Sequence, residues 1–262
     1  MSTLLKVDNV VKNFSGLTAV SNVSMYLDTN ELVALIGPNG AGKTTLFNLL
    51  TGVIPVSSGS IVLNGDNGTY PLNGKPAYKI AKMGLSRTFQ NIRLFKELTV
   101  MDNVLIAMTS KVKEGFIPTI FRFPSYYKTE AKLTEKAKQL LEIFELENDV
   151  DVLAKNLPYG TQRKLEIVRA LATEPQILFL DEPAAGMNPE ETAELTQLII
   201  KVQRKFHITI LLIEHDMSLV MNLAQRIYVL DHGSLLAKGT PEEIQSNPAV
   251  IKAYLGCLLY TS

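Results

Sequence analysis

The sequence predicts an α/β protein with an open sheet, and three observations favour this fold class. The apolar run 32–36 is followed at once by a glycine-rich segment and then by residues that favour a helix. A second apolar run, 177–180, ends in the adjacent acids Asp181 and Glu182. Two later segments carry apolar residues at helical spacing. Short, wholly apolar strands of this kind are typical of a sheet that helices cover on both faces.

The expected elements follow from the apolar runs and the turn residues between them. Strands are predicted at residues 4–11, 19–27, 32–37, 60–63 and 208–213. A helix is expected over 44–50. Two helical stripes predict core faces rather than binding grooves: Leu133, Ala137, Leu140, Leu141 and Phe144, then Leu195, Leu198, Ile199, Val202 and Phe206. Periodicity fails over 108–130, where aromatic residues and prolines predict an insertion within a helical lobe.

Composition narrows the class of protein. A chain of 262 residues with 46% hydrophobic content can bury a large core and forms one large domain or two closely associated lobes. Lysine plus arginine equals aspartate plus glutamate at 26 each, so no general positive field favours nucleic acid as a partner. The apolar runs are far shorter than the ~20 residues of a membrane-spanning helix.

The compartment is expected to be the cytoplasm. Lys6 and Asp8 interrupt the apolar stretch that a signal peptide would need near the N-terminus. The single cysteine, Cys257, cannot form a disulfide within the chain. Together these features predict a soluble cytoplasmic protein.

The segment GPNGAGKTT predicts a phosphate-binding loop. Backbone N–H groups of such a loop surround phosphate oxygens, and the helix that follows points its positive end at them. Lys43 is then expected to contact the β and γ phosphates, and the Thr44 hydroxyl to bind Mg²⁺. Glycines also form ordinary tight turns, but their spacing before Lys-Thr, between strand and helix, favours a nucleotide site. The expected nucleotide-binding residues are Gly37, Pro38, Asn39, Gly40, Ala41, Gly42, Lys43, Thr44 and Thr45.

The acids at the end of the run 177–180 predict the other half of this site. The carboxyl end of a strand in an open α/β sheet is the usual place for a ligand. Asp181 is expected to bind Mg²⁺, directly or through water. Glu182 can orient an attacking water or accept its proton. An ordinary acidic strand end before Pro183 is the alternative, and the phosphate loop makes it less favoured.

These motifs together resemble the ATP-binding cassette (ABC) family. In family order the chain carries GPNGAGKTT, TFQNIRLF, LPYGTQ, ILFLDEP, AAGMNP and LLIEHD, and the resemblance covers nearly the whole chain. The segments QRKLEIVRAL, DEPAAGMNP, IEHDM, GTPEEI and AYLG look most like the ATPase subunits of branched-chain amino-acid importers.

The resemblance implies a fold and a division of the chain. The fold is that of an ABC-type P-loop NTPase, with a RecA-like mixed-sheet core, an N-terminal antiparallel β subdomain and a helical subdomain. The chain is expected to be a single ABC ATPase domain. Its expected parts are a nucleotide-binding core at 1–89 and 161–240, a helical subdomain at about 90–160, a C-terminal helix at 241–256 and a tail at 257–262.

The resemblance also assigns roles to single residues. Phe14 matches the aromatic that stacks on adenine, although a core aromatic is the alternative. Gln90 matches the loop glutamine that contacts Mg²⁺ and the attacking water. His215 follows an apolar strand and is expected to reach the γ-phosphate and hold Glu182 in line. The implied catalytic set is Glu182, His215, Gln90 and Lys43, and the implied metal set is Thr44, Gln90 and Asp181.

A further implied element acts on the nucleotide of a second subunit. The family signature corresponds here to Leu157, Pro158, Tyr159, Gly160 and Thr161, before a helix expected from about 162 to 173. Its N-terminal N–H groups would face the γ-phosphate held by the partner cassette. The common form is LSGGQ, so Pro158 and Tyr159 depart from it. Asn188 also stands where many members carry an aspartate.

The expected partners and cofactors follow from the resemblance. They are ATP, Mg²⁺, a second ABC ATPase subunit forming a homodimer or heterodimer, and two transmembrane permease subunits, with no direct contact to nucleic acid. The expected place is the cytoplasmic face of the inner membrane, bound peripherally. Three other readings stay open: the ATPase of a lipopolysaccharide exporter, a soluble ABC ATPase outside transport, and a small-molecule kinase that shares only the phosphate loop.

Overall fold

The computed structural model describes residues 2–65, 68–109 and 124–258. The chain divides into two compact units. Unit 1 comprises residues up to Arg87 and from Gln176 onward, and unit 2 comprises Thr88–Pro175. The residues expected in the helical subdomain, about 90–160, fall within unit 2.

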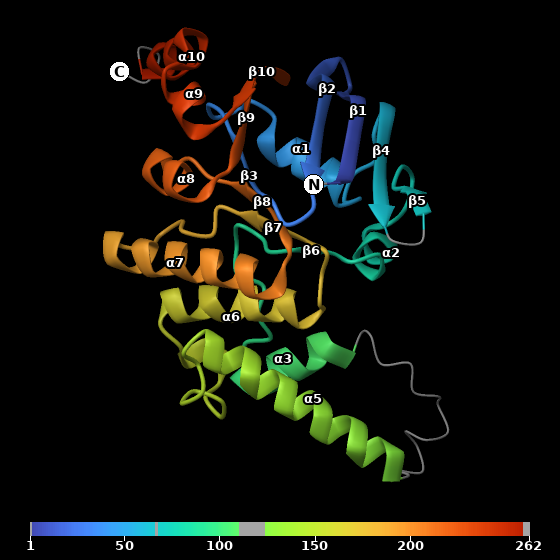
Figure 1. The fold of residues 1–262 in the computed structure, drawn as a ribbon, viewed down its shortest axis with the longest axis vertical. Coiled ribbons are helices and arrows are strands. Elements are labelled where there is room, and N and C mark those ends of the chain that lie inside the picture. Colours follow the sequence, from blue (N-terminus) through green and yellow to red (C-terminus); the bar gives the residue numbers. More distant parts are fainter. Residues whose placement is uncertain (1, 66–67, 110–123, 259–262) are drawn as a thin grey trace. The chain divides into compact units, whose positions relative to one another are not determined.

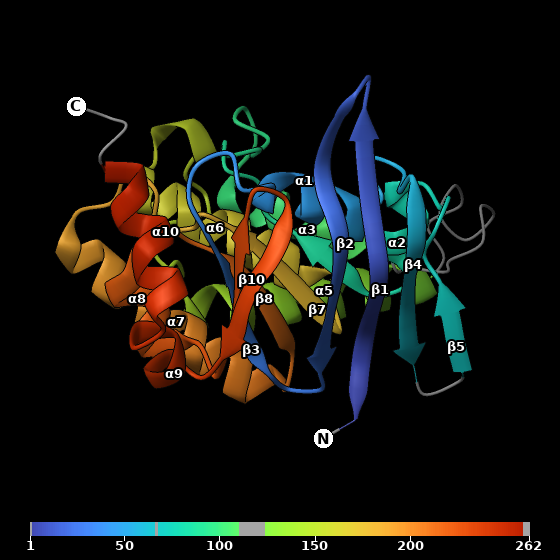
Figure 2. The same ribbon diagram turned by 90° about the horizontal axis from the view of Figure 1, so that it is seen from above.

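Unit 1 begins with an antiparallel sheet in the order β2-β1-β4-β5 (Figure 2). Its strands are β1 (Thr3–Phe14), β2 (Leu17–Asp28), β4 (Ser58–Gly65) and β5 (Gly68–Pro71). Ser15 and Gly16, both with positive φ, form the two-residue turn between β1 and β2. The predicted strands at 4–11, 19–27 and 60–63 are confirmed, and β5 is a strand that the sequence did not predict.

The second sheet of unit 1 is mixed, in the order β10-β9-β3-β8-β7-β6 (Figure 1). Its strands are β3 (Leu32–Ile36), β6 (Leu85–Arg87), β7 (Ile177–Asp181), β8 (Thr209–Ile213), β9 (Arg226–Asp231) and β10 (Ser234–Gly239). Every residue of β3, β7 and β8 is buried. Only β10 runs antiparallel to its neighbour. The α/β class and the mixed-sheet core are therefore confirmed.

The helices of unit 1 are α1 (Lys43–Leu50), α2 (Ala77–Lys82), α7 (Pro189–Phe206), α8 (Met217–Leu223), α9 (Pro241–Gln245) and α10 (Pro248–Leu258). The core face predicted for α7 is buried at Leu195, Ile199 and Val202, but Phe206 is exposed because the helix ends there. The stretch 241–256 forms two helices, because Asn247 accepts a hydrogen bond from the N–H of Ala249 and starts α10 anew. The expected tail overlaps α10 at 257–258, and 259–262 lie outside the described residues.

Unit 2 is helical. It contains α3 (Val100–Thr109), α5 (Pro124–Ile143), the short 3₁₀ helix η1 (Ala154–Asn156) and α6 (Tyr159–Ala172), and α3 packs against both α5 and α6. Ala137, Leu141 and Phe144 of the predicted stripe are buried. Of the expected insertion 108–130, residues 124–130 belong to α5, and 110–123 lie outside the described residues.

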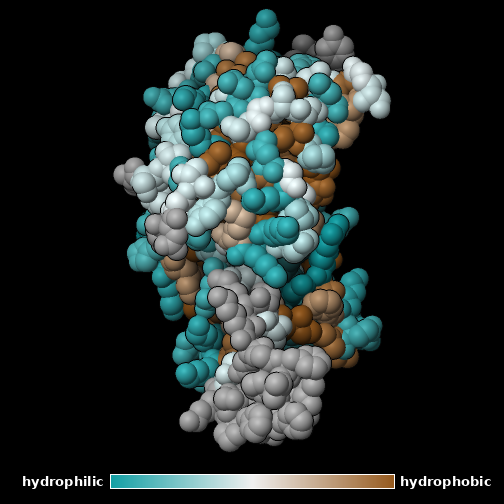
Figure 3. All heavy atoms as spheres, turned by 90° about the vertical axis from the view of Figure 1, so that its right-hand side faces the viewer, coloured by the Kyte–Doolittle hydropathy of each residue, from teal (hydrophilic) through white to brown (hydrophobic). Residues whose placement is uncertain are grey.

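Among the described residues, no helix combines the length and the apolar character needed to cross a bilayer. On the face drawn in Figure 3, hydrophilic and apolar residues are interspersed.

Candidate functional site

The predicted phosphate loop joins β3 to α1, and its glycines are required by the backbone. A Cβ atom on Gly37 would lie 2.2 Å from the carbonyl oxygen of Leu230, and one on Gly42 would lie 2.6 Å from that of Ala19. Gly42 also has a φ of +97°, which only glycine adopts readily. The loop is therefore packed against β9 on one side and β2 on the other.

The start of α1 is open to a ligand. Gly42 is the N-cap and provides no side chain to bind the first N–H groups of the helix. Those groups have no partner within a helix and are available to an anion. Asn39, Gly40 and Thr44 are exposed. A nucleotide phosphate fits this cradle of backbone donors.

Lys43 belongs to the same loop. Its side chain is 8% exposed, and Nζ donates to the carbonyl oxygens of Gly37 at 2.7 Å and Pro38 at 3.0 Å. Burial lowers the pKa of Lys43, while the negative charge of Glu182 opposes that change. The predicted lysine and the predicted acid therefore lie close enough to interact.

The register of the sheet explains this proximity. Leu35 of β3 pairs with Ile213 of β8, and Ile213 pairs with Asp181 of β7, all three strands running parallel. The residues that follow these strand ends must emerge along one edge of the sheet. The backbone N–H of Glu182 donates to the carbonyl oxygen of Ile213 at 3.0 Å, and Glu182 has a φ of +47°. This left-handed turn is uncommon for a residue with a side chain.

Three ionisable side chains meet at the ends of β7 and β8. His215 Nδ1 lies 4.0 Å from Glu182 Oε1 and 3.9 Å from Glu214 Oε2. Glu214 is 1% exposed and accepts hydrogen bonds from the N–H groups of Ala184 at 3.0 Å and His215 at 3.2 Å. Burial raises the pKa of Glu214, and the negative charge of Glu182 adds to that change. Glu214 thus fixes the turns that carry both Glu182 and His215.

Asp181 is held by an arginine that the sequence analysis missed. Arg87 Nη2 lies 2.7 Å from Asp181 Oδ2, and both side chains are buried. Arg87 Nη1 donates to the Asn48 side chain at 2.6 Å and to Thr51 Oγ1 at 3.2 Å, both in or just after α1. The guanidinium therefore connects the end of α1 with the tip of β7.

The donor chemistry near Asp181 also suits Mg²⁺. Within the described part of the chain, no group of three or more histidine, cysteine, aspartate or glutamate side chains could hold a metal ion by itself. Mg²⁺ typically uses one or two protein oxygens together with substrate phosphates. The Thr44 hydroxyl and the Asp181 carboxylate provide oxygens of that kind, so they fit an ion that arrives with a nucleotide.

Phe14 lies at the end of the β1–β2 hairpin. Its side chain is 43% exposed, and Lys12 Nζ lies 4.9 Å from the ring centroid. Strand β2 also contains Ala19, whose carbonyl oxygen faces Gly42 of the phosphate loop. The exposure contradicts the alternative of a core aromatic and leaves the ring available for stacking.

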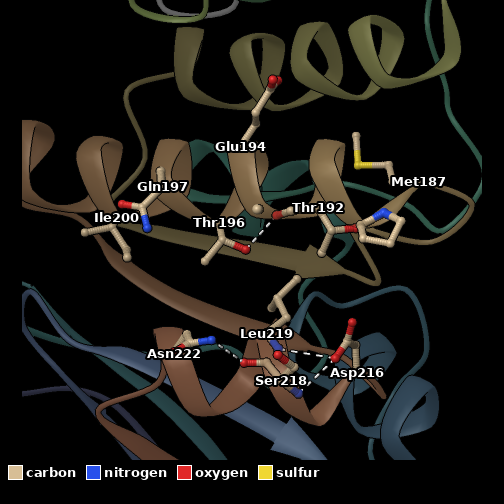
Figure 4. A pocket seen from close by; sticks show the side chains of 12 residues that line it. Met187, Thr192, Glu194, Thr196, Gln197, Ile200, Asp216, Ser218, Leu219 and Asn222 are labelled. Atoms are coloured by element: carbon tan, nitrogen blue, oxygen red, sulfur yellow. Dashed lines mark hydrogen bonds between the residues drawn. The ribbon is translucent and has the colours of Figure 1, made fainter.

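A groove of about 700 Å³ lies between α7 and α8, and Figure 4 shows side chains that line it. It starts at Met187 and Asp216, next to the segments that follow Glu182 and His215. Asp216 Oδ1 accepts from the N–H groups of Ser218 at 2.8 Å and Leu219 at 3.3 Å and thereby caps α8. This cap fixes the backbone conformation of the residues that directly follow His215.

Gln90 belongs to unit 2, where two residues of α6 hold its loop. Arg163 Nη1 donates to the carbonyl oxygen of Phe89 at 2.8 Å, and Nη2 donates to that of Gln90. Glu166 lies 3.0 Å from Arg163 and accepts from the N–H groups of Phe89 and Arg93, each at 3.4 Å. The Gln90 side chain is exposed. Burial raises the pKa of Glu166, and Arg163 opposes that change.

The signature residues also lie in unit 2, at the start of α6. The helix begins at Tyr159, three residues before the expected start, with Pro158 as its N-cap. Tyr159 and Pro158 are exposed, and no side chain caps the first turn. The N–H groups of Tyr159, Gly160 and Thr161 therefore occupy the first turn, while Pro158 contributes no donor. Leu157 is buried ahead of the helix.

Each unit contains residues that contact predicted site residues or their loops and that the motif pattern did not single out: Arg87 and Glu214 in unit 1, and Arg163 and Glu166 in unit 2. A signal for Glu214 was present, because it follows an apolar strand in the same way that Asp181 ends one. The roles of the three others depend on long-range contacts. No local pattern could have predicted those contacts.

Comparison with protein families agrees with this geometry. A family model described as ABC transporter matches residues 20–185. A second model, described as branched-chain amino acid ATP-binding cassette transporter, matches residues 234–256.

Similar proteins extend the agreement over the whole chain. The chain is 48% identical over 253 residues to the high-affinity branched-chain amino acid transport ATP-binding protein LivG of Escherichia coli K12, covering 97% of this chain and 98% of that one. It is 46% identical to BraF of Pseudomonas aeruginosa, with the same coverage. The lipopolysaccharide export system ATP-binding protein LptB of Haemophilus influenzae is 30% identical, again over 97% and 98%.

A solved structure supports the fold in the same way. The ADP conformation of MJ1267, an ATP-binding cassette of an ABC transporter, matches with a TM-score of 0.83 and 30% identity, covering 98% of this chain and 100% of that one. Full-length identity at this level, the family match and the nucleotide loop lead to one conclusion. This chain belongs to the ATP-binding proteins of ABC transporters.

Proposed function

We propose that this chain is the ATP-hydrolysing subunit of an importer for branched-chain amino acids. The names of LivG and BraF, the relatives at 48% and 46% identity, support this solute class. The match of residues 234–256 to a branched-chain amino acid transporter model supports it independently. LptB, at 30% identity, makes lipopolysaccharide export the weaker candidate.

The observation that carries the hydrolytic role is the row of strand ends at β3, β8 and β7. It brings Lys43, Glu182 and His215 to one edge of the sheet. We assign the β and γ phosphates to Lys43 and to the N–H groups at the start of α1. Glu182 orients the attacking water and accepts its proton, and His215 holds Glu182 in place from 4.0 Å.

The magnesium ion and the adenine ring of the nucleotide complete this assignment. Thr44, Asp181 and Gln90 are the residues proposed to hold Mg²⁺, which neutralises charge on the transferred phosphoryl group when it is bound. Phe14 is proposed to stack on adenine. Such stacking tolerates any base, so it contributes affinity and little choice between ATP and GTP.

The proposed assembly contains two cassettes and two membrane subunits. The N–H groups of Tyr159, Gly160 and Thr161 would face the γ-phosphate held by the second cassette, as an anion at a helix N-terminus is stabilised by the dipole. ATP then favours the closed pair, because it contacts both cassettes only in that state. We place the chain on the cytoplasmic face of the inner membrane, bound to the permease subunits.

The test is reconstitution. The chain is purified with the two hydrophobic membrane subunits with which it associates, placed in proteoliposomes, and assayed for ATP-dependent uptake of radiolabelled leucine in the presence of the cognate binding protein. Uptake that requires ATP supports the proposal. Association with membrane subunits that move lipopolysaccharide, or ATP hydrolysis without any leucine uptake, would contradict the solute while leaving the ATPase role intact.

A further inference from the structure

The guanidinium of Arg87 joins two parts of the nucleotide site that are far apart in the sequence. It lies 2.7 Å from Asp181 at the tip of β7. It also donates to Asn48 at 2.6 Å and to Thr51 at 3.2 Å, at the far end of the helix whose first residues are Lys43 and Thr44.

The environment of Arg87 makes this contact specific. The side chain is 9% exposed and that of Asp181 is 5% exposed, so water screens the pair little. The guanidinium carbon also lies 5.5 Å from the ring centroid of Phe47, which itself packs edge-on against Phe179 at 5.4 Å. A planar group with fixed donors, held by Asn48, Thr51 and the Phe47 ring, restrains the orientation of the carboxylate that it contacts.

We propose that Arg87 is a positioning residue that orients Asp181 for the magnesium ion of the nucleotide. The proposal rests on the proposed function, because it requires that Mg²⁺ and ATP bind at this site. Arg87 contacts Asp181 and two residues of the α1 region, so it fixes the distance between the carboxylate and the helix that carries Thr44. Groups that orient a metal ligand typically change metal affinity about 10- to 100-fold when they are lost.

The position of Arg87 in the chain also links Asp181 to the segment that carries Gln90. It is the last residue of unit 1, and Thr88, Phe89 and Gln90 follow it directly. A change in the orientation of Asp181 therefore acts on the residue from which the Gln90 segment departs. Through its ion pair with Asp181, Arg87 connects the proposed metal carboxylate to the beginning of that segment, and Gln90 follows three residues later.

The test compares ATP affinity with and without Mg²⁺. Binding of a fluorescent ATP analogue to the full chain is measured in Mg²⁺ and in EDTA at equal ionic strength. The readout is the Mg²⁺ ratio, defined as the dissociation constant in EDTA divided by the dissociation constant in Mg²⁺. In Arg87→Met we expect this ratio to fall about 10- to 100-fold, with affinity in EDTA within about twofold of the unchanged protein. Arg87→Lys keeps the positive charge but loses the planar pair of guanidinium donors, so we expect an intermediate Mg²⁺ ratio.

Arg226→Met is the matched control. Arg226 is a second ion-paired arginine of unit 1. Its side chain is 13% exposed and pairs with Glu31 at 2.5 Å. It pairs with Val33 in the register of β9 with β3, at the other end of β3 from the phosphate loop. Its replacement should leave the Mg²⁺ ratio unchanged. If Arg87→Met does not fold, the Asn48→Ala variant tests the proposal instead. It removes one hydrogen-bond partner of the guanidinium and should lower the Mg²⁺ ratio about two- to threefold.

An unchanged or increased ratio in folded Arg87→Met overturns the proposal, and so does an unchanged ratio in Asn48→Ala when Arg87→Met is unfolded. An increase would mean that the arginine competes with the metal instead of preparing its ligand. If the unsubstituted protein itself binds no ATP, or binds it equally well in EDTA, the proposed function fails. That result is separate from any effect of Arg87.

Discussion

Units 1 and 2 each contain a buried glutamate that holds a loop of the proposed site. Glu214 in unit 1 accepts hydrogen bonds from Ala184 and His215, and Glu166 in unit 2 accepts them from Phe89 and Arg93. Burial raises the pKa of both. A carboxylate that binds two backbone N–H groups is a compact way to fix a turn.

The two glutamates differ in their charged neighbours. Arg163 lies 3.0 Å from Glu166 and compensates its charge within unit 2. Glu214 faces His215 at 3.9 Å and the like charge of Glu182, which adds to the rise in its pKa. Glu166 thus has a counter-charge within its own unit, whereas Glu214 lies beside a histidine and a like-charged carboxylate. The comparison therefore favours a structural role for Glu166, while Glu214 lies beside the two side chains proposed for catalysis, Glu182 and His215.

The largest expected effect tests the chemical side. Glu182→Gln should lower ATP turnover by about 10²- to 10⁴-fold, because the amide cannot accept a proton from water. ATP binding should remain, and the closed pair of cassettes should accumulate. Turnover is measured as phosphate release and binding by equilibrium titration. Glu242→Gln, an exposed acid of α9, is the control. Turnover of Glu182→Gln near that of the control would remove Glu182 from the proposed role.

The next effect tests the structural side. Arg163→Ala leaves Glu166 buried without its counter-charge and should destabilise unit 2 by about 3–5 kcal/mol. Urea unfolding followed by far-UV circular dichroism measures the free energy. The double change Arg163→Met with Glu166→Leu removes both charges and should cost less than the single change. A cost below about 1 kcal/mol for Arg163→Ala would show that the pair does not hold the loop of Gln90.

These two predictions also separate what the sequence could reveal from what it could not. The phosphate loop and the acids of β7 follow from local patterns, because strand, turn and helix signals lie within a few residues of each other. The clamp of Arg163 on residues 89–90 joins segments more than 70 positions apart. No periodicity reports such a contact. Arg87 and Asp181 are separated in the same way.

Element boundaries show a related limit. The resemblance to the family places the start of α6 near residue 162, directly after the signature residues 157–161. In the structure Pro158 is the N-cap, a position where its missing N–H is not needed, so the helix starts at Tyr159. The exposed Phe206 fails as a core residue for a similar reason, because it is the last residue of α7 and the stripe continues past the layer it covers.

A smaller effect concerns the first turn of α6. Pro158→Ser restores a hydroxyl and an N–H at the N-cap, where a bond to phosphate is worth enough to change the rate about tenfold. We expect the ATPase rate of the assembled complex to rise by up to that factor. If the partner is a different cassette chain, only the site completed by this helix should accelerate. No increase in rate would count against this interpretation of Pro158.

The smallest effect is a pH dependence that distinguishes Glu214. The pKa of Glu214 is raised above its ordinary value of 4.5, so the folded protein binds this proton more tightly than the unfolded chain does. The corresponding stability is complete below pH 4.5 and is lost as the pH rises through the folded pKa. Relative to Glu214→Gln, the unsubstituted protein should therefore lose stability over that range. Urea unfolding at a series of pH values measures it, and parallel profiles would contradict the assignment.

The strand order of the mixed sheet has a consequence for synthesis of the chain. Strand β3 is wholly apolar, yet its neighbours in the sheet are β8 and β9, which the ribosome produces only after all of unit 2. The antiparallel strands β1, β2 and β4 can pair early. Residues 32–36, in contrast, have no neighbouring strand of their own sheet until β8 and β9 have been synthesised. Unpaired apolar strands are prone to aggregate. Nascent chains stalled before residue 209 should therefore be the form of this protein that most depends on chaperones.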